Sequence, residues 1–169
     1  MEQDYKIIDN FLDDKDYHYL KNIILNDDFP WRFRSSTTNQ EHKKDKGFFT
    51  YNFYENFKND KNLFESIIIP ILHKLNATSV IQTRANLILT DLLKERYLTF
   101  HNDYGDNNMT AIFNFTDSDG GTVLKINDKY KEVLSKENRM LIFKGSIPHT
   151  SIKPTNVDRR YILNINYFI

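Results

Sequence analysis

The feature that most constrains the fold is a series of short apolar segments, set close together and separated by turn residues, that runs from residue 83 to the C-terminus. Clusters of Gly, Asn and Asp at 105–108 and 117–121 interrupt this series. Many short strands with turns between them are typical of a β-sandwich or barrel. The expected strands are 84–90, 97–101, 110–115, 121–126, 139–143, 148–152 and 160–168.

The N-terminal part mixes helices and strands. Apolar residues recur at helical spacing after Asp13-Asp14, and again from about residue 62 to 75, where Pro70 is expected to bend the helix. Residues 35–46 contain no apolar side chain and predict a surface loop. Further strands are expected at 5–8, 31–34 and 48–54.

These patterns together predict a mainly β fold with some α structure. We expect a double-stranded β-helix, or jelly roll, that is buttressed by N-terminal helices. The 169 residues fit one domain, 1–169, with the helical buttress at about 1–80 and the jelly-roll core at about 81–169.

Composition removes several classes of protein. The chain has no Cys, which excludes disulfides and thiolate metal sites and leaves His, Asp and Glu as the strong metal ligands. Lys+Arg 23 balances Asp+Glu 23, and this disfavours a nucleic-acid partner. No signal peptide or membrane-spanning run is evident, so we expect a cytoplasmic protein without a membrane partner. The sequence leaves the oligomeric state open.

Two of the five His residues lie in an arrangement suited to a metal. His101 and Asp103 stand two residues apart at the end of an expected strand, so both side chains can point to one face. His149 begins another expected strand. Two imidazoles and one carboxylate form the facial triad of non-haem Fe(II) oxygenases. His18, His42 and His73 have contexts typical of solvated or core-edge His residues.

The last expected strand separates its residues by parity. Residues 161, 163, 165 and 167 are apolar or aromatic and should pack outward on the helices. Residues 160, 164 and 166 are polar and should face a wet cavity, which usually holds a ligand. Arg160 would then point inward and could bind a carboxylate, whereas Arg159 would be a solvated charge. The alternative for Arg160 is a salt bridge at the barrel rim.

An ordered set of segments carries a resemblance to a known family. The segments are RANLIL (84–89), FHND (100–103), TAIFNF (110–115), GGTVL (120–124), NRMLIFKGSIPHT (138–150) and RRYILNINYF (159–168). The chain resembles the 2-oxoglutarate/Fe(II)-dependent oxygenases of the prolyl-4-hydroxylase-like group, and is most similar to compact members from bacteria and bacteriophages. If it is viral, its location would be the host cytoplasm.

The resemblance implies roles for individual residues. His101, Asp103 and His149 would bind the iron, and Arg160 would bind the distal carboxylate of 2-oxoglutarate. Asn86 and Asn114 would stand in the co-substrate shell, and Asn166, which faces the same cavity by parity, is expected there as well. Asn114 and Ile88 stand where relatives often carry Tyr, so this shell departs from the family pattern.

The resemblance also implies the activity. With Fe(II), 2-oxoglutarate and O₂, such an enzyme decarboxylates 2-oxoglutarate oxidatively and hydroxylates a substrate, and ascorbate would be a stimulant. Asp103 favours hydroxylation over halogenation, because halogenating relatives lack this carboxylate. The expected substrate is a prolyl or other peptide residue, or a small amino-acid-like molecule. Its candidate contacts are Trp31, Arg32 and Arg84, although Trp31 also fits a core position.

Two alternatives to an oxygenase remain from sequence. The first is a non-catalytic β-barrel that binds a metal or a carboxylate ligand. The second is a metal-dependent hydrolase in which His101, Asp103 and His149 hold Zn²⁺. No candidate general base near the triad supports this second alternative.

Overall fold

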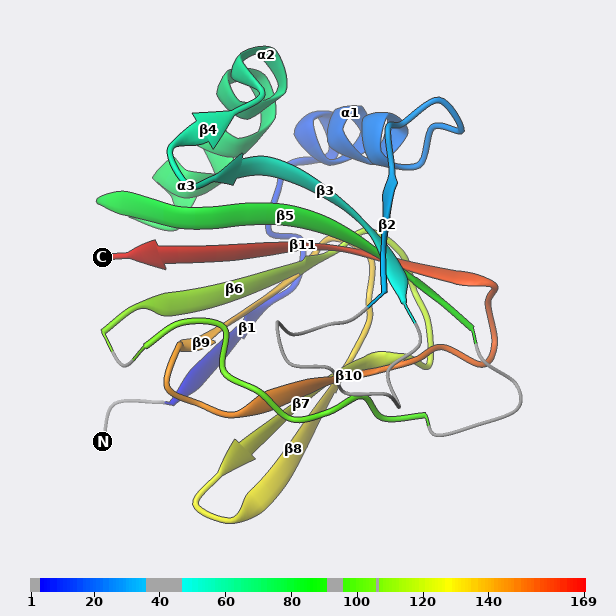
Figure 1. Cartoon of the computed structure of the whole chain (residues 1–169), viewed down its shortest axis with the longest axis vertical. Coiled ribbons are helices and arrows are strands. Elements are labelled where there is room, and N and C mark those ends of the chain that lie inside the picture. The colour runs from blue at the N-terminus through cyan, green and yellow to red at the C-terminus, as the bar shows by residue number, and fades with distance from the viewer. Residues whose placement is uncertain (1–3, 36–46, 91–95, 106) are drawn as a thin grey trace.

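The protein is described here by a computed structural model that covers residues 4–35, 47–90, 96–105 and 107–169. Its strands form two antiparallel sheets (Figure 1). The main sheet has the order β1-β9-β6-β11-β5-β3-β2, with β4 paired to β3, and the small sheet has the order β10-β7-β8. The prediction of a mainly β, jelly-roll fold is therefore confirmed.

The elements have the following bounds. The main sheet contains β1 (Tyr5–Ile8), β2 (Arg32–Arg34), β3 (Phe48–Glu55), β4 (Lys58–Asn59), β5 (Ser79–Leu89), β6 (Met109–Asn114), β9 (Arg139–Lys144) and β11 (Arg159–Phe168). The small sheet contains β7 (Gly121–Ile126), β8 (Lys129–Leu134) and β10 (His149–Ile152). The helices are α1 (Asp14–Ile24), α2 (Lys61–Leu63), the π-helical η1 (Phe64–Ile68) and α3 (Ile69–Lys74).

The helices cover one face of the main sheet, and the small sheet lies on its other side (Figure 1). Asp13 caps α1 by accepting a hydrogen bond from the Asp16 amide at 2.9 Å. The helix buries Tyr17, Leu20 and Ile24, which are the residues that the periodicity selected. A large apolar core therefore fills the space between the helices and the sheet.

The second helical region is bent where expected. Pro70 lies in the first turn of α3, directly after the π-helical turn η1. Proline lacks an amide hydrogen and cannot complete the regular helical ladder, which accounts for the irregular turn before it. Ile67, Ile68 and Ile71 still reach the core.

Several expectations about strands need correction. The segment 97–101 is not a strand and forms only isolated bridges, Tyr97 to Ile152 and His101 to His149. Strand β8 was not predicted, because five of its six side chains are exposed and it shows no apolar alternation. The region 1–80 also supplies β1, β2 and β3 to the main sheet, so it is more than a helical support.

Two further expectations concern the loop 35–46 and membrane-spanning segments. The predicted loop 35–46, with His42, falls almost entirely outside the described residues. Within the described part of the chain, no helix is both long and apolar enough to cross a membrane.

Candidate metal centre and co-substrate pocket

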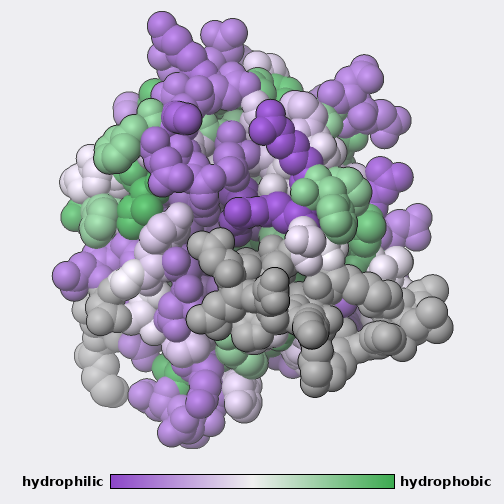
Figure 2. Space-filling model, viewed as in Figure 1, coloured by the Kyte–Doolittle hydropathy of each residue, from purple (hydrophilic) through white to green (hydrophobic). Residues whose placement is uncertain are grey.

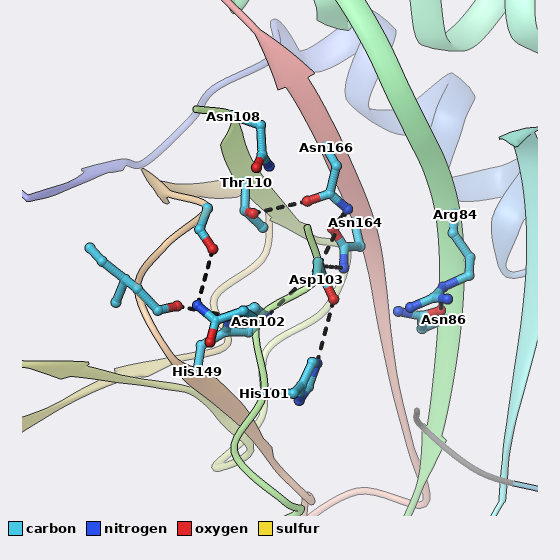
Figure 3. A network of polar contacts seen from close by, with 12 residues as sticks. Arg84, Asn86, His101, Asn102, Asp103, Asn108, Thr110, His149, Asn164 and Asn166 are labelled. Carbon is cyan, nitrogen blue, oxygen red and sulfur yellow. Dashed lines mark hydrogen bonds and ion pairs between the residues drawn. The ribbon is translucent and has the colours of Figure 1, made fainter. Parts of the chain in front are cut away.

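His101, Asp103 and His149 come together between the two sheets (Figure 3). One potential ligand atom from each lies within 4.8 Å of the other two. His101 and His149 are held side by side by a pair of backbone hydrogen bonds of 3.0 and 2.9 Å. The bridge between a loop and β10 therefore fixes the spacing of the two imidazoles.

Backbone carbonyls orient both imidazole rings. The Nδ1 atom of His101 lies 3.0 Å from the carbonyl oxygen of Thr99, and that of His149 lies 3.3 Å from the carbonyl oxygen of Ile147. With Nδ1–H donating to these oxygens, each Nε2 faces the Asp103 carboxylate. A protonated imidazole donates or lends its charge to Asp103 there, and a neutral one presents the Nε2 lone pair to a metal. Those Nε2 atoms lie 3.5 and 3.8 Å from the Asp103 carboxylate. Such outer contacts are typical of histidines that bind metals.

The charges of the three groups are coupled. Burial alone would raise the pKa of Asp103, but hydrogen bonds from His101 and Asn164 and the charge of His149 hold it well below its usual range. Burial opposes the charged form of His101, yet the contact with Asp103 outweighs it and raises the His101 pKa. Burial lowers the pKa of His149. Asp103 is therefore ionised, as a metal ligand must be.

Two asparagines on β11 hold the Asp103 carboxylate in place. The side-chain amides of Asn164 and Asn166 donate to Asp103 Oδ2 at 2.7 and 3.3 Å. Thr110 donates in turn to Asn166 at 2.9 Å. Asn166 was expected in the co-substrate shell and is instead placed against Asp103. Asn164 was not predicted as a site residue, although its inward parity on the last strand carried the signal.

The residues present fit a divalent transition metal. Two neutral imidazoles and one ionised carboxylate, each oriented by a second contact, form the donor set of a 2-His-1-carboxylate site. The absence of Cys leaves no thiolate competitor. His101, Asp103 and His149 would hold the ion.

A pocket of about 510 Å³, measured to its open mouth, lies beside these residues. Its wall mixes apolar and polar side chains: Phe48, Arg84, Asn86, Ile88, Leu98, His101, Ile112, Thr122, His149, Thr150, Ser151, Ile162 and Asn164. Most of these side chains are buried and come from both sheets. The pocket is therefore the space that the parity of β11 predicted.

Arg160 lies behind one wall of this pocket and is only 1% exposed. Its guanidinium donates to neutral oxygens only: Ser135 Oγ at 2.5 Å, Ser151 Oγ at 2.8 Å, Asn114 Oδ1 at 3.1 Å and Thr122 Oγ1 at 3.4 Å. Ser151 and Thr122 belong to the pocket wall. Burial lowers the pKa of Arg160 to about 9, which leaves it charged at neutral pH. Among the described residues no carboxylate pairs with it, so the rim salt bridge is not observed.

Of the other predicted site residues, some line the pocket and some lie away from it. Asn86 and Arg84 line the pocket, and Asn114 touches Arg160 but not the pocket wall. Arg32 is exposed on β2. The substrate role expected for Trp31 is not supported, because its ring packs on Phe29 and Tyr161 at 4.8 and 6.0 Å, on the helix-covered side of the sheet.

No protein-family model and no curated protein sequence matches the chain. Solved structures match it over nearly its whole length. A Pseudomonas putida prolyl-4-hydroxylase aligns with a TM-score of 0.67 at 13% identity, covering 99% of this chain and 94% of the other. A 2OG-Fe(II) oxygenase-family oxidoreductase from Burkholderia pseudomallei gives a TM-score of 0.71 at 8% identity, covering 98% and 86%.

A prolyl hydroxylase from Trichoplax adhaerens, solved with a hypoxia inducible factor peptide fragment, gives a TM-score of 0.69 at 15% identity. That alignment covers 99% of this chain and 84% of the other. The chain has the fold of the 2OG-Fe(II) oxygenases. The resemblance seen in the sequence is thus confirmed at the level of the fold.

Proposed function

We propose that the protein is a non-haem Fe(II) dioxygenase that couples oxidative decarboxylation of 2-oxoglutarate to hydroxylation of a substrate. One observation carries the proposal. A 2-His-1-carboxylate group and a buried arginine without an anionic partner among the described residues lie at the same pocket, in the fold that these enzymes share.

The metal-binding residues have distinct tasks in this proposal. His101, Asp103 and His149 would hold the ion and leave its remaining positions open to 2-oxoglutarate and O₂. When bound, Fe(II) supplies the redox chemistry with O₂ that yields succinate, CO₂ and a hydroxylated product. Asn164 and Asn166 would keep the Asp103 carboxylate in one orientation.

The walls of the pocket would bind and shield the co-substrate. Arg160 would bind the distal carboxylate of 2-oxoglutarate, because a buried cation gains most from an anion that replaces neutral contacts. Ser151 and Thr122 could contribute hydroxyl donors beside it. The apolar side chains of Ile88, Ile112 and Ile162 would exclude water from the reacting atoms.

The substrate would be a peptide residue or a small amino-acid-like molecule that enters through the open mouth of the pocket. The peptide complex of the Trichoplax relative supports a peptide as one class. Arg84 on the pocket wall and Arg32 on β2 are the candidate contacts, whereas Trp31 packs against the core.

Succinate formation from 2-oxoglutarate tests the proposal. The protein with Fe(II), ascorbate and O₂ should release succinate slowly even without substrate, and Asp103→Ala should abolish the release. Arg159→Gln, which changes the exposed neighbour of Arg160, is the matched control and should behave as the wild type. The proposal is wrong if the protein binds neither Fe(II) nor 2-oxoglutarate and forms no succinate.

A further inference from the structure

A second arginine, Arg84, is buried in the pocket on the opposite side from the Asp103 carboxylate. It projects from β5, is 9% exposed and lines the pocket with His101 and Asn164. Figure 3 shows it beside Asn86, across from Asp103 and His101. A cation in this position is costly unless something compensates its charge.

The contacts of Arg84 leave much of its guanidinium free. Its Nε donates to Asn86 Oδ1 at 2.9 Å, and its Cζ lies 6.0 Å from the centre of the Phe48 ring. Over the part of the chain that the structure describes, it forms no ion pair and no other hydrogen bond. Both terminal nitrogens therefore keep donors for a ligand in the pocket.

The two described carboxylates that act on Arg84, Glu55 and Asp103, are already engaged. Glu55 accepts hydrogen bonds from Gln82 and, at 2.6 Å, from Asn52. Asp103 is held by Asn164 and faces both imidazoles. Each influences the charge of Arg84 from a distance, but neither pairs with it.

Arg84 and Arg160 occupy different ends of the same wall. On β11, Asn164 is the partner of Arg84 and lies next to Asp103, whereas Arg160 is the partner of Ile88. Four residues of β5 separate these positions, or roughly 13 Å along the strand. Arg84 is thus beside the metal-binding residues, and Arg160 is at the far end.

Counted over the described groups at the pocket, the charges leave one positive charge without an anionic partner. A divalent ion, Arg84 and Arg160 bring four positive charges, while Asp103 and doubly ionised 2-oxoglutarate bring three negative ones, with both imidazoles neutral. Arg34 and Glu55, which also act on Arg84, offset each other. The loaded pocket would therefore carry one uncompensated positive charge, and low dielectric makes such a charge attract an anion strongly.

We propose that Arg84 binds a free carboxylate of the substrate, which makes the substrate a small acid, a free amino acid or a peptide with its own terminal or side-chain carboxylate. The inference rests on the proposed function. The nearby strand β2 carries a further exposed cation, Arg32. Figure 2 shows hydrophilic side chains near the centre of the face that β2 crosses in Figure 1, so a polar ligand meets a polar surface there.

The first test measures binding rather than turnover. With the co-substrate position filled by Zn²⁺ and N-oxalylglycine, the Arg84 Nε–Hε resonance is followed by ¹⁵N NMR during titration with acetate and, separately, with acetamide. We expect a saturable shift with acetate, none with acetamide, and loss of the resonance in Arg84→Gln. Arg84→Lys retains the charge and guards against a folding defect, and Arg159→Gln is the control.

The second test uses a panel of free amino acids, short dicarboxylic acids and short peptides, each paired with its amide. Acids should stimulate 2-oxoglutarate turnover at least tenfold more than their amides in the wild type, and Arg84→Gln should remove this difference. Stimulation by single amino acids or by peptides with a free C-terminus identifies the source of the carboxylate.

The outcomes separate this inference from the proposed function. If the wild type makes succinate but acetate gives no saturable shift, or amides stimulate as well as acids, Arg84 is not a carboxylate receptor. If Arg84→Gln weakens N-oxalylglycine binding tenfold, Arg84 serves the co-substrate and the inference is wrong. If no succinate forms and N-oxalylglycine does not bind, the proposed function itself fails.

Discussion

The two faces of β11 have opposite characters although their residues alternate along one strand. Leu163 and Ile165 are fully buried against the helix-covered core. Asn164 and Asn166 are also buried, but their side-chain amides donate hydrogen bonds to Asp103. The first face stabilises the fold and tolerates any good packing, whereas the second places polar groups where a ligand needs them.

The largest expected effect is on the polar side. His149→Ala removes one of the three metal ligands, and metal affinity should fall by more than about 100-fold, beyond what loss of an outer contact costs. Isothermal titration with Co²⁺ or Zn²⁺ measures this. His73→Ala, which changes an exposed side chain on α3, is the control, and equal affinity in both variants would refute the site.

Leu163→Ala tests the apolar face. Leu163 is fully buried, so the lost packing and the cavity should reduce the free energy of unfolding by about 3 kcal/mol. Urea denaturation measures the change. Metal affinity should be unchanged in the folded variant; a large loss of affinity would mean that the two faces are not independent.

Arg160→Met separates stability from binding. Affinity for 2-oxoglutarate should fall about 100-fold, as when one partner of a buried charge pair is removed. The variant should remain folded, because it also removes a buried cation that has only neutral partners. Binding of N-oxalylglycine and the melting temperature are the two measurements. Unchanged binding would exclude Arg160 as the anion receptor.

Asn164→Ala should have a smaller effect on the metal. It removes the 2.7 Å hydrogen bond to Asp103 but no ligand, so metal affinity should fall about tenfold. The spectrum of the Co²⁺ form should change as the carboxylate reorients. If affinity and spectrum match the wild type, Asn164 has no positioning role and the polar face is less specific than described.

The smallest effect on stability is expected at Asp9, which lies away from both faces of β11. Arg139 and Lys136 donate to Asp9 and hold its pKa well below the ordinary value of 3.8. A carboxyl group with a lowered folded pKa stabilises the protein above its unfolded pKa, and this contribution is lost as the pH falls below 3.8. Asp9→Asn should cost less than about 1 kcal/mol at pH 7 and less still near pH 2, measured by urea midpoints.

Parity explains why much of the site could be predicted from sequence. A strand with one apolar and one polar face must turn its apolar face to the core. The inward direction of Arg160 and Asn164 can therefore be predicted from the residues alone. The sequence identifies His101 and His149 as candidate ligands, and the β-bridge between them brings the two imidazoles together.

The orientation of Trp31 and the partner of Asn166 could not be predicted, because both depend on contacts between distant segments. Trp31 lies next to a three-residue strand, and only the pairing of β2 with β3 decides which side its ring takes. Asn166 is expected beside the co-substrate but contacts Asp103, and the sequence does not show where Asp103 lies relative to β11. Asp103 belongs to a segment without regular structure, whose path has no periodic signal.

The irregular segment 96–105 is a candidate for local unfolding. Residues 96–105 carry two of the three ligands. Isolated bridges and a few backbone hydrogen bonds to β10 and its flank tie them to the barrel, without a continuous strand. A bound ion would act as a cross-link that closes the chain between His101 and His149 and restricts the entropy of the open form. Amide hydrogens of this segment should therefore exchange first in the apoprotein and slow most on metal binding, which would make local unfolding, rather than the global transition, the step that metal loading controls.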